Sequence, residues 1–397
     1  MPGSQPPPAQ ERNAMTARMV RPRLMSWASD VDVQTLDQAE RTARLPIVAG
    51  HVALMPDAHF GLGSTVGSVI PTEGAVIPSA IGVDIGCGMI AVRMDLTAAQ
   101  LPDTLAPVMP LFEKRIPAGV GQAHDHGVTL AGLGEPATEL TPKQQKTAAT
   151  QFGTLGSGNH FVEVCLDEHD HVWLVLHSGS RGIGNQLAQK AIAQAKGLAK
   201  ERMESLEDPD LAYLVEGDRA WQTYITDMLW AQRYALGSRE RMMDAAVRSL
   251  VEVVGHGREV QRINCHHNFT QREEHGGRSL WITRKGAIKA AKGDLGVIPG
   301  SMGTRSYIIE GLGSEASYNS CAHGAGRRLS RRQARKTLTV DSLKESMTGR
   351  VWNDRSALAL LDEHPASYKD IDQVMADQTD LVAVQATLRQ IVNYKGT

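Results

Sequence analysis

The hydrophobic and polar positions of the chain follow two periods, and each period predicts a different kind of element. Over residues 45–93, short apolar runs alternate with glycine and proline, which is typical of strands joined by turns. Further apolar runs of strand length occupy residues 172–176, 279–283, 296–298 and 307–309. Between residues 186 and 254, apolar side chains recur instead at helical spacing. The pattern predicts an α+β fold with a helical insertion near residues 186–254.

The segments between these elements also carry signals. Residues 117–146 are rich in glycine, proline, threonine and charged residues, which predicts a long irregular connection. Ser330 and Gln333 form a capping box that would open a basic helix, and residues 368–392 indicate a helix followed by extended chain. No internal repeat or clean linker divides the sequence. We therefore expect one domain of mixed β-sheets packed with helices over residues 26–397.

Composition narrows the class of protein. No apolar run approaches the roughly 18 to 20 residues that cross a bilayer, so we expect a soluble protein without a membrane role. Residues 1–25 are rich in proline and arginine and lack the apolar core of a secretory signal, which predicts a disordered arm and no export. The net charge of −2 means that any nucleic acid would be held by a local basic patch.

The four cysteines are too dispersed for a disulfide framework, so we expect reduced thiols in a cytoplasm. Cys87 has the strongest context, because it lies three residues after Asp84 in the glycine-bearing segment at residues 82–88. Glycine frees the backbone there, and a carboxylate and a thiol can then face one point. Taken alone, the segment also fits a buried cysteine in a glycine-rich turn.

Three histidines lie in similar short segments that contain glycine or polar residues: His160, His177 and His267. Each one alone is more often a structural histidine than a ligand. Together with Asp84 and Cys87, however, they form a mixed ligand set suited to a divalent ion such as manganese or zinc. The affinity order of divalent metals favours zinc, so the residue types do not select the metal.

A second constellation surrounds His323. Gly324 and Gly326 allow backbone N–H groups to approach an anion, while His323 offers an imidazole that could attack phosphorus. The alternative is a histidine in a tight turn. Residues 299–304 form another small-residue loop, which is not a Walker motif because no Gly-Lys-Ser/Thr closes it. A basic run over residues 327–336 is either a solvated helix face or a phosphate contact, and its position beside His323 favours RNA.

Taken together, these segments resemble the RtcB family of RNA ligases, in its bacterial form, over residues 25–397. The matching segments occur in the family's order at residues 55–59, 84–87, 153–161, 177–184, 265–269, 283–287, 299–304, 323–327 and 395–396. The resemblance implies a single RtcB-type domain whose sheets and helices surround a central cavity for metal and GTP.

The resemblance also assigns a role to each matched residue. It implies that Asp84, Cys87, His160, His177 and His267 hold two manganese ions, with Cys87 between them, and that His323 is the residue that carries GMP. His266 leaves an ambiguity, which we resolve in favour of His267 because His267 directly precedes Asn268. The implied GTP contacts are Asn159, His160, Phe161, Val162, Glu163, Pro299, Gly300, Ser301, Met302, Ser306, Gly324, Ala325, Gly326 and Lys395. Arg181 and Lys285 are implied ligands of the RNA phosphate, and Asp57 a polar group near the joining site.

The function implied by the resemblance is the joining of RNA 3′-phosphate or 2′,3′-cyclic phosphate ends to 5′-hydroxyl ends, with GTP consumed, in tRNA splicing or RNA repair. Two alternatives stay open. The same ligands could serve a binuclear metal-dependent phosphoesterase by activating water. The fold could also belong to a non-catalytic RNA-binding protein, although the presence of every implied ligand and of His323 counts against it.

Overall fold

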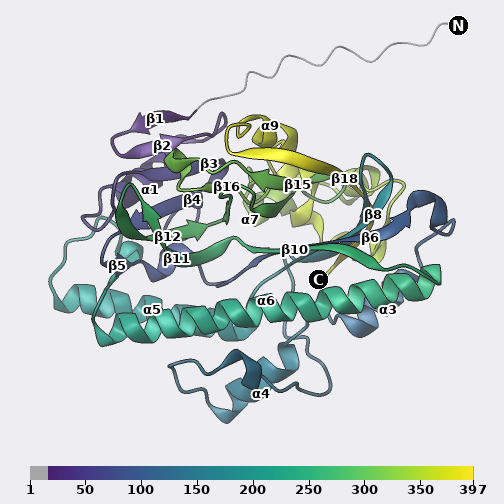
Figure 1. Cartoon of the computed structure of the whole chain (residues 1–397), viewed down its shortest axis with the longest axis horizontal. Coiled ribbons are helices and arrows are strands. Elements are labelled where there is room, and N and C mark those ends of the chain that lie inside the picture. The colour runs from purple at the N-terminus through teal and green to yellow at the C-terminus, as the bar shows by residue number, and fades with distance from the viewer. Residues whose placement is uncertain (1–16, 397) are drawn as a thin grey trace, which may run out of the picture.

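The computed structural model describes residues 17–396, and most of its strands gather into two sheets (Figure 1). The first sheet has the order β1-β2-β3-β4-β12-β11, in which β2 and β3 pair in parallel and the other neighbours are antiparallel. Its strands are β1 (Arg18–Arg21), β2 (Leu24–Ser26), β3 (Val52–His59), β4 (Val66–Thr72), β11 (Asn268–His275) and β12 (Arg278–Lys285).

The second sheet has the order β10-β6-β8-β7-β18-β15-β14, and β17 pairs in parallel with β18. Its strands are β6 (Gly88–Thr97), β7 (Phe161–Leu166), β8 (His171–Ser178), β10 (Glu259–His266), β14 (Leu295–Pro299), β15 (Arg305–Gly311), β17 (Val351–Trp352) and β18 (Val382–Lys395). Two short pairs join β13 (Ala287–Lys289) to β16 (Ser320–Ala322) and β5 (Ala75–Val76) to β9 (Leu214–Val215).

The central strands of the second sheet are buried on both faces, which explains their continuous apolar runs. Along β8, Leu174 packs into a cluster that includes Met242 and Leu250, whereas the neighbouring Val175 packs on the opposite face with Ile308 and other residues. Successive side chains of a strand point to opposite faces, so both neighbours must be apolar where both faces are covered.

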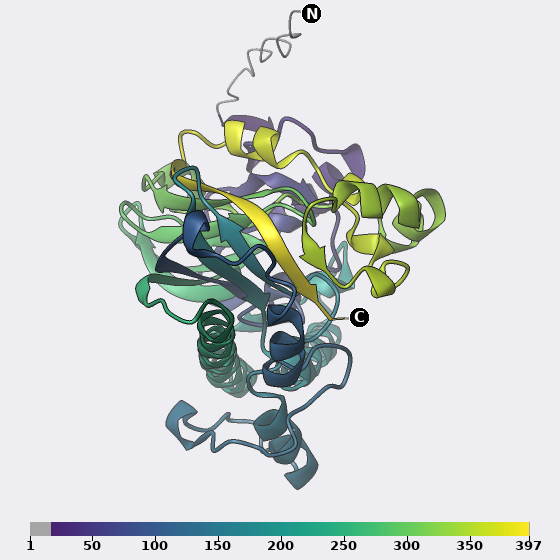
Figure 2. The same ribbon diagram turned by 90° about the vertical axis from the view of Figure 1, so that its right-hand side faces the viewer.

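Two long helices cover one side of the sheets. Helices α5 (Arg181–Glu201) and α6 (Arg219–Val254) lie side by side below the strands in Figure 1 and are seen nearly end-on in Figure 2. Helix α6 spans 36 residues and ends where Gly255 adopts a left-handed conformation with φ of 87°, a conformation that suits glycine. The other helices are α1 (Val33–Ala43), α2 (Pro78–Ile81), α3 (Val108–Arg115), α4 (Pro142–Gln151), α7 (Arg331–Thr337), α8 (Val340–Ser346) and α9 (Ile371–Ala376).

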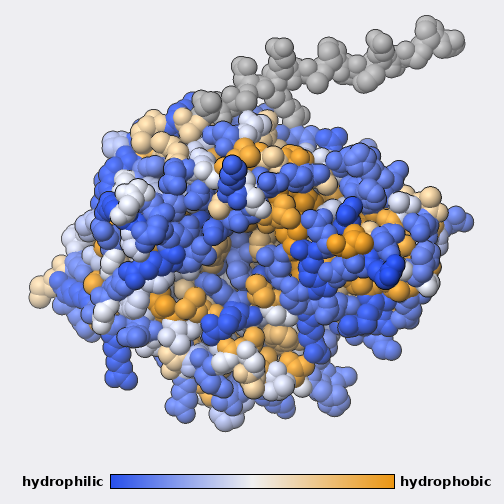
Figure 3. Space-filling view, viewed as in Figure 1, coloured by the Kyte–Doolittle hydropathy of each residue, from blue (hydrophilic) through white to orange (hydrophobic). Residues whose placement is uncertain are grey.

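The face of the molecule seen in Figure 3 is mainly polar. On the face shown in Figure 3, hydrophilic residues cover most of the area and hydrophobic residues gather in separate patches. Within residues 17–396, none of the helices combines the length and the apolar character that a membrane span requires.

The structure confirms the α+β class, and α5 and α6 supply the predicted helical insertion. The expected capping box opens α7, where the Ser330 hydroxyl accepts a hydrogen bond from the backbone N–H of Gln333. The disordered arm predicted for residues 1–25 is wrong in its extent. Residues 18–26 form β1 and β2 and pair with the first sheet, because their apolar side chains, such as the fully buried Leu24, pack into its core. Residues 1–16 lie outside the described part of the chain.

Leu174 allows a test of the buried sheet. Leu174→Ala should lower the free energy of unfolding by about 2 to 5 kcal/mol, because it removes apolar contacts and leaves a cavity in a fully buried strand. The matched control is Leu236→Ala on α6, a half-exposed leucine whose truncation should change stability by less than about 0.5 kcal/mol. Urea-induced unfolding followed by circular dichroism measures both, and equal losses would contradict the burial of β8.

Candidate active site and metal centre

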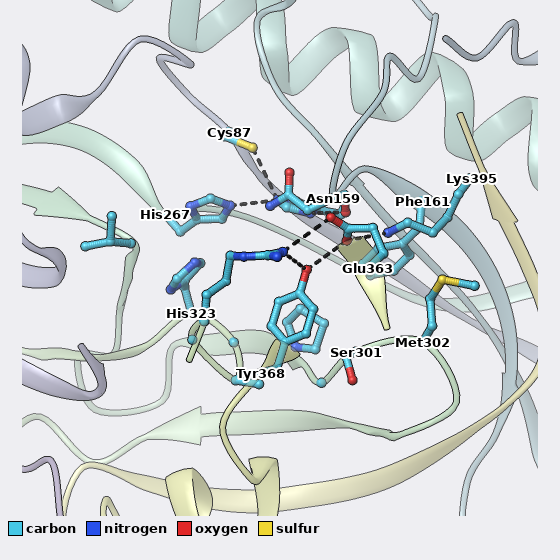
Figure 4. Close-up of a pocket in the computed structure, with 18 of the residues that line it drawn as sticks. Cys87, Asn159, Phe161, His267, Ser301, Met302, His323, Glu363, Tyr368 and Lys395 are labelled. Carbon is cyan, nitrogen blue, oxygen red and sulfur yellow. Dashed lines mark hydrogen bonds and ion pairs between the residues drawn. The ribbon is translucent and has the colours of Figure 1, made fainter. Parts of the chain in front are cut away.

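A single pocket collects the ends of strands from both sheets. Cys87 immediately precedes β6, Phe161 begins β7, His177 lies near the end of β8, Lys285 ends β12 and Lys395 ends β18. All five side chains line the pocket, although they come from segments that are far apart in the sequence (Figure 4). The sheet pairings therefore bring chemically active residues together at one edge of the fold.

One wall of the pocket carries a cluster of ligand-type atoms. The Sγ of Cys87 lies 3.2 Å from Nε2 of His177 and 3.6 Å from Nε2 of His160, and Nε2 of His177 lies 2.9 Å from Nε2 of His267. The ligand atoms of Cys87, His160 and His177 all lie within 4.8 Å of one another. Asp84 completes the cluster, because its Oδ2 is 3.2 Å from Nε2 of His160.

Backbone carbonyls orient the imidazoles. His160 donates from Nδ1 to the carbonyl of Leu155 at 2.8 Å, and His177 donates from Nδ1 to the carbonyl of Asn159 at 3.1 Å. A proton on Nδ1 leaves Nε2 with a lone pair directed into the cluster, which is the arrangement typical of metal-binding histidines. Burial also lowers the pKa values of His177 and His267 well below the usual range, so both rings stay neutral.

The Asp84 carboxylate is held by the segment that follows β8. Its Oδ1 accepts a hydrogen bond of 2.9 Å from the backbone N–H of Ser180. The preceding residue must be glycine, because a Cβ at Gly179 would lie 2.1 Å from the same oxygen.

The cluster fits a divalent metal. Ligand bonds of roughly 2.0 to 2.3 Å place neighbouring donor atoms about 3 to 4 Å apart around one ion, and the spacings above fall in or near that range. Burial raises the pKa of the Cys87 thiol well above its usual value, an effect that a bound cation would oppose by favouring the thiolate. The set of one carboxylate, one sulfur and three imidazoles is compatible with manganese or zinc.

His323 stands next to this cluster with its ring fixed by a buried carboxylate. Its Nδ1 donates to Oδ2 of Asp57 at 2.6 Å, and the ring centroid lies 4.7 Å from that of His267. The same Asp57 oxygen accepts from the backbone N–H groups of His323 and Gly324. Because Nδ1 is committed to Asp57, the lone pair on Nε2 is available for nucleophilic attack.

The loop after His323 approaches Asp57 closely, and glycine makes this approach possible. Gly326 has a φ of 72°, and a Cβ there would lie 2.2 Å from the carbonyl oxygen of Asp57. A larger residue would therefore both strain the backbone and push the loop away from β3.

On the other side of the pocket, Lys395 contacts Glu363 (Figure 4), and its charge also acts on Glu163. Burial raises the pKa of Glu163 to about 8, against the opposing charge of Lys395. Burial would also raise the pKa of Glu363, but the charges of Lys395 and Arg331 outweigh it and lower that pKa to about 2. Lys395 donates to Glu363 at 3.1 Å, and its Nζ lies 5.6 Å from the ring centroid of Phe161. Glu363 is therefore ionised at neutral pH, whereas Glu163 keeps its proton.

The structure brings most of the residues predicted from sequence into the pocket wall. Of the expected metal ligands and the nucleophile, those that line it are Asp84, Cys87, His177, His267 and His323, and His160 lies directly behind them against Asp84 and Cys87. The expected GTP contacts that line it are Asn159, Phe161, Glu163, Pro299, Gly300, Ser301, Met302, Gly324, Ala325, Gly326 and Lys395. His266 does not join them, because it faces α6 and bonds to Gly86 and Arg239.

Besides His160, two expected GTP contacts do not line the pocket, Val162 and Ser306. Val162 points away from the pocket into the apolar cluster beneath β7, as alternation along the strand requires. Ser306 is fully buried in β15 opposite Leu388 and does not line the pocket. Both were expected as GTP contacts because the resemblance implies them.

The three expected RNA contacts have different surroundings. Asp57 is fully buried and hydrogen-bonded to His323, and a carboxylate in this position would repel a phosphate. Arg181 does not line the pocket, since its guanidinium lies against Gly156. Lys285 lines the pocket, but its ammonium donates to the carbonyls of Leu62, Ser64 and Ser79. A phosphate would have to replace one of these three acceptors.

Several pocket residues were not identified from the sequence: His59, Val66, Glu363, Tyr368, Gln390 and Asn393. Glu363 and Tyr368 lie in a stretch of short turns around residues 361–368, where no period or motif marks them. Arg327 and Arg331 belong to the basic run and also line the pocket. Arg331 is ion-paired with Asp362 and Glu363, so part of the run is neutralised within the protein.

The fold and the pocket define an α+β protein in which a candidate metal-binding group adjoins a histidine fixed by a carboxylate. A family model described as tRNA-splicing ligase RtcB matches residues 38–140 and 128–396. The chain therefore belongs to the RtcB family. It is 44% identical to RNA-splicing ligase RtcB1 and to RNA-splicing ligase RtcB, from two strains of Escherichia coli, over 93% of this chain and 96% of each relative. It is 29% identical to the tRNA-splicing ligase RtcB of Nanoarchaeum equitans, over 91% and 92%.

Cobalt(II) provides a test of the cluster. Wild-type protein titrated with Co²⁺ should develop the near-ultraviolet thiolate-to-cobalt charge-transfer band, and Cys87→Ser should lose it, because Cys87 supplies the sulfur in the cluster. Cys165→Ser is the matched control, since that thiol is buried in β7 and should leave the band intact. A band that survives in Cys87→Ser would exclude this site.

The raised pKa of Glu163 leads to a second prediction, about how stability depends on pH. Its pKa is 4.5 in a model peptide and about 8 in the folded protein, so between these values the folded state holds a proton that the unfolded chain releases. The contribution to stability is complete below pH 4.5 and falls by about 1.4 kcal/mol per pH unit as the pH rises toward 8. Glu163→Gln, which keeps an uncharged group, should show a flatter dependence in urea unfolding at pH 5 to 8. If the free energy of unfolding depended on pH equally in the wild type and in Glu163→Gln, the raised pKa of Glu163 would be contradicted.

Proposed function

We propose that this protein is a GTP- and manganese-dependent RNA ligase that joins RNA 3′-phosphate or 2′,3′-cyclic phosphate ends to 5′-hydroxyl ends. The observation that carries the proposal is the position of His323, which lies beside the candidate metal cluster with Nδ1 bonded to Asp57. The names of the relatives, RNA-splicing and tRNA-splicing ligases, support an RNA substrate. We propose the cytoplasm as its location and tRNA splicing or RNA repair as its setting.

In the first proposed step, Nε2 of His323 attacks the α-phosphorus of GTP. The new bond joins nitrogen to phosphorus, the bond from that phosphorus to the oxygen bridging the α- and β-phosphates breaks, and pyrophosphate leaves. The imidazole becomes positively charged during the attack. The carboxylate of Asp57, hydrogen-bonded to Nδ1, offsets this charge in a buried environment where it would otherwise be costly.

In the second step an oxygen of the RNA 3′-phosphate attacks the GMP phosphorus, and Nε2 of His323 recovers its electron pair as the nitrogen–phosphorus bond breaks. The RNA then ends in a diphosphate linkage to guanosine. In the third step the 5′-hydroxyl of the second strand attacks the RNA phosphorus, its proton is released and GMP leaves. A cyclic phosphate end is first opened by water to a 3′-phosphate.

The proposed metal ligands are Asp84, Cys87, His160, His177 and His267, and the proposed number of manganese ions is two. When bound, the ions would withdraw charge from the phosphate oxygens and help to align the leaving group. The residues of the chain itself supply the remaining functions. Gly324, Ala325 and Gly326 line the pocket beside His323, on the side proposed for the phosphates, and Phe161, Glu163 and Lys395 line the side proposed for guanosine.

The two alternatives predict different behaviour. A binuclear phosphoesterase would use water as its nucleophile and would have no need for a histidine oriented toward phosphorus. A pure RNA-binding protein would need neither the cluster nor the buried Asp57–His323 pair. Burial of the Asp57 carboxylate is energetically unfavourable, and such a protein would gain nothing from it. The geometry of His323 therefore favours the ligase.

Labelling with α-³²P GTP and manganese tests the proposal. The wild-type protein should acquire an acid-labile label, and His323→Ala should acquire none. Asp57→Asn should label roughly 10²- to 10⁴-fold more slowly, because the amide lacks the charge that holds Nδ1 protonated.

Asp167→Asn is the matched control for the aspartate substitution. Asp167 pairs with His171 at 3.1 Å in the turn between β7 and β8, at the opposite end of these strands from Phe161 and His177. This variant should label at the wild-type rate. A wild-type protein that binds manganese but stays unlabelled would refute the ligase, and release of phosphate from RNA ends without labelling would support the phosphoesterase.

A further inference from the structure

Phe60 is unusual among the aromatic side chains of this protein. Its side chain is 47% exposed, whereas every other phenylalanine, tyrosine and tryptophan in the described residues is buried or only partly exposed. Leu62, two residues further, is 75% exposed. Single exposed apolar residues are common on protein surfaces, but an aromatic and a leucine in one short turn form a local apolar surface that calls for a partner.

The turn at residues 59–64 is fixed in place, so its apolar side chains are held outward. The side-chain amide of Gln38 donates to the carbonyls of Gly61 and Gly63, and its oxygen accepts from the N–H of Gly61 at 3.1 Å. From the other side, Lys285 donates to the carbonyls of Leu62 and Ser64. A turn restrained by both residues loses little conformational entropy when something binds to it.

This turn adjoins the candidate active-site pocket through its first residue, His59. Phe60 follows His59, which lines the pocket, and lies three residues after Asp57, which holds His323. Val66 and Lys285 continue the same wall. A strand whose terminal phosphate reaches His323 leaves its adjoining nucleotides outside the pocket, and the turn that begins at His59 is a surface next to it.

We propose that Phe60 is a stacking platform for an RNA base beside the junction, with Leu62 extending the apolar surface. The inference deepens the proposed ligase function and rests on it for the identity of the bound strand. Single-stranded RNA is commonly recognised by stacking unpaired bases on aromatic faces, and this contact tolerates any base because each has a π-face. The platform thus fits an enzyme that holds an RNA end without reading its sequence.

A binding experiment tests the platform without depending on catalysis. Equilibrium binding of a single-stranded RNA with a 3′-phosphate is compared for wild type, Phe60→Ala and Phe60→Trp. Phe60→Ala removes the aromatic ring on which the base stacks and should weaken RNA binding by roughly 5- to 100-fold. Phe60→Trp keeps an aromatic ring and should bind RNA as well as wild type. The salt dependence of binding should stay unchanged, because no phosphate contact is lost. Val384→Ala, a similarly exposed apolar residue on β18, is the control and should bind normally.

Abasic RNA locates the stacked nucleotide. One base at a time is removed from the last two nucleotides of the 3′-phosphate strand and from the first two of a 5′-hydroxyl strand. At one position, removal of the base should lower the RNA affinity of the wild type by the same roughly 5- to 100-fold. The same abasic RNA should bind Phe60→Ala no more weakly than the intact RNA does. Equal penalties in both proteins at every position, or unchanged binding by Phe60→Ala, would overturn the proposal.

Guanylylation separates this inference from the ligase itself. Phe60→Ala should acquire the GMP label at the wild-type rate, because Phe60 contacts neither His323 nor the guanosine side of the pocket in the proposed arrangement. A wild type that binds RNA through Phe60 but is never labelled would refute the ligase and leave the platform standing. A Phe60→Ala protein that fails to label would show that the side chain acts on the nucleotide site and would overturn the platform.

Discussion

The register of four neighbouring antiparallel strands is the constraint on which the site depends. In that register, Met89 pairs with His177, Phe161 pairs with His177 from the other side, and Gly88 pairs with His266. These pairings place the cluster residues at the same end of these four strands. A slip of one residue in β8 would turn His177 to the opposite face and destroy the cluster. The packing of Leu174 against Met242 and Leu250 on one face, and of Val175 against Ile308 on the other, opposes such a slip. The apolar core and the chemistry therefore depend on the same contacts.

The pairing of Asp57 with His323 connects the first sheet to the loop that follows β16. Asp57 belongs to β3 of the first sheet, and its carboxylate is fully buried, with three N–H donors directed at a single oxygen. A buried carboxylate without hydrogen-bond donors would lower the stability of the fold. The hydrogen bonds to Asp57 therefore hold the loop that carries His323 in one position. The stability of the fold and the orientation of the His323 ring therefore share one hydrogen-bonding arrangement.

The sequence predicted the fold class, the helical insertion and the residues of the cluster, because periodicity and short motifs are local properties. It did not identify Glu363 or Tyr368, whose place in the pocket follows from the packing of irregular turns against β18. Val162 and Ser306, which the resemblance implies as GTP contacts, do not line the pocket. Asp57 was recognised by its motif, but its role as the partner of His323 emerged only from the meeting of β3 with a loop 266 residues away.

The dispersion of the site along the chain limits how the protein can be divided. Cys87, His177, His267, His323 and Lys395 stand on successive segments, and each pair of neighbours in this series is separated by a stretch that also builds one of the sheets. No cut between residues 87 and 395 leaves all of them on one fragment. Circular permutation, which keeps every segment, is compatible with this layout, whereas a working catalytic half cannot be excised from it.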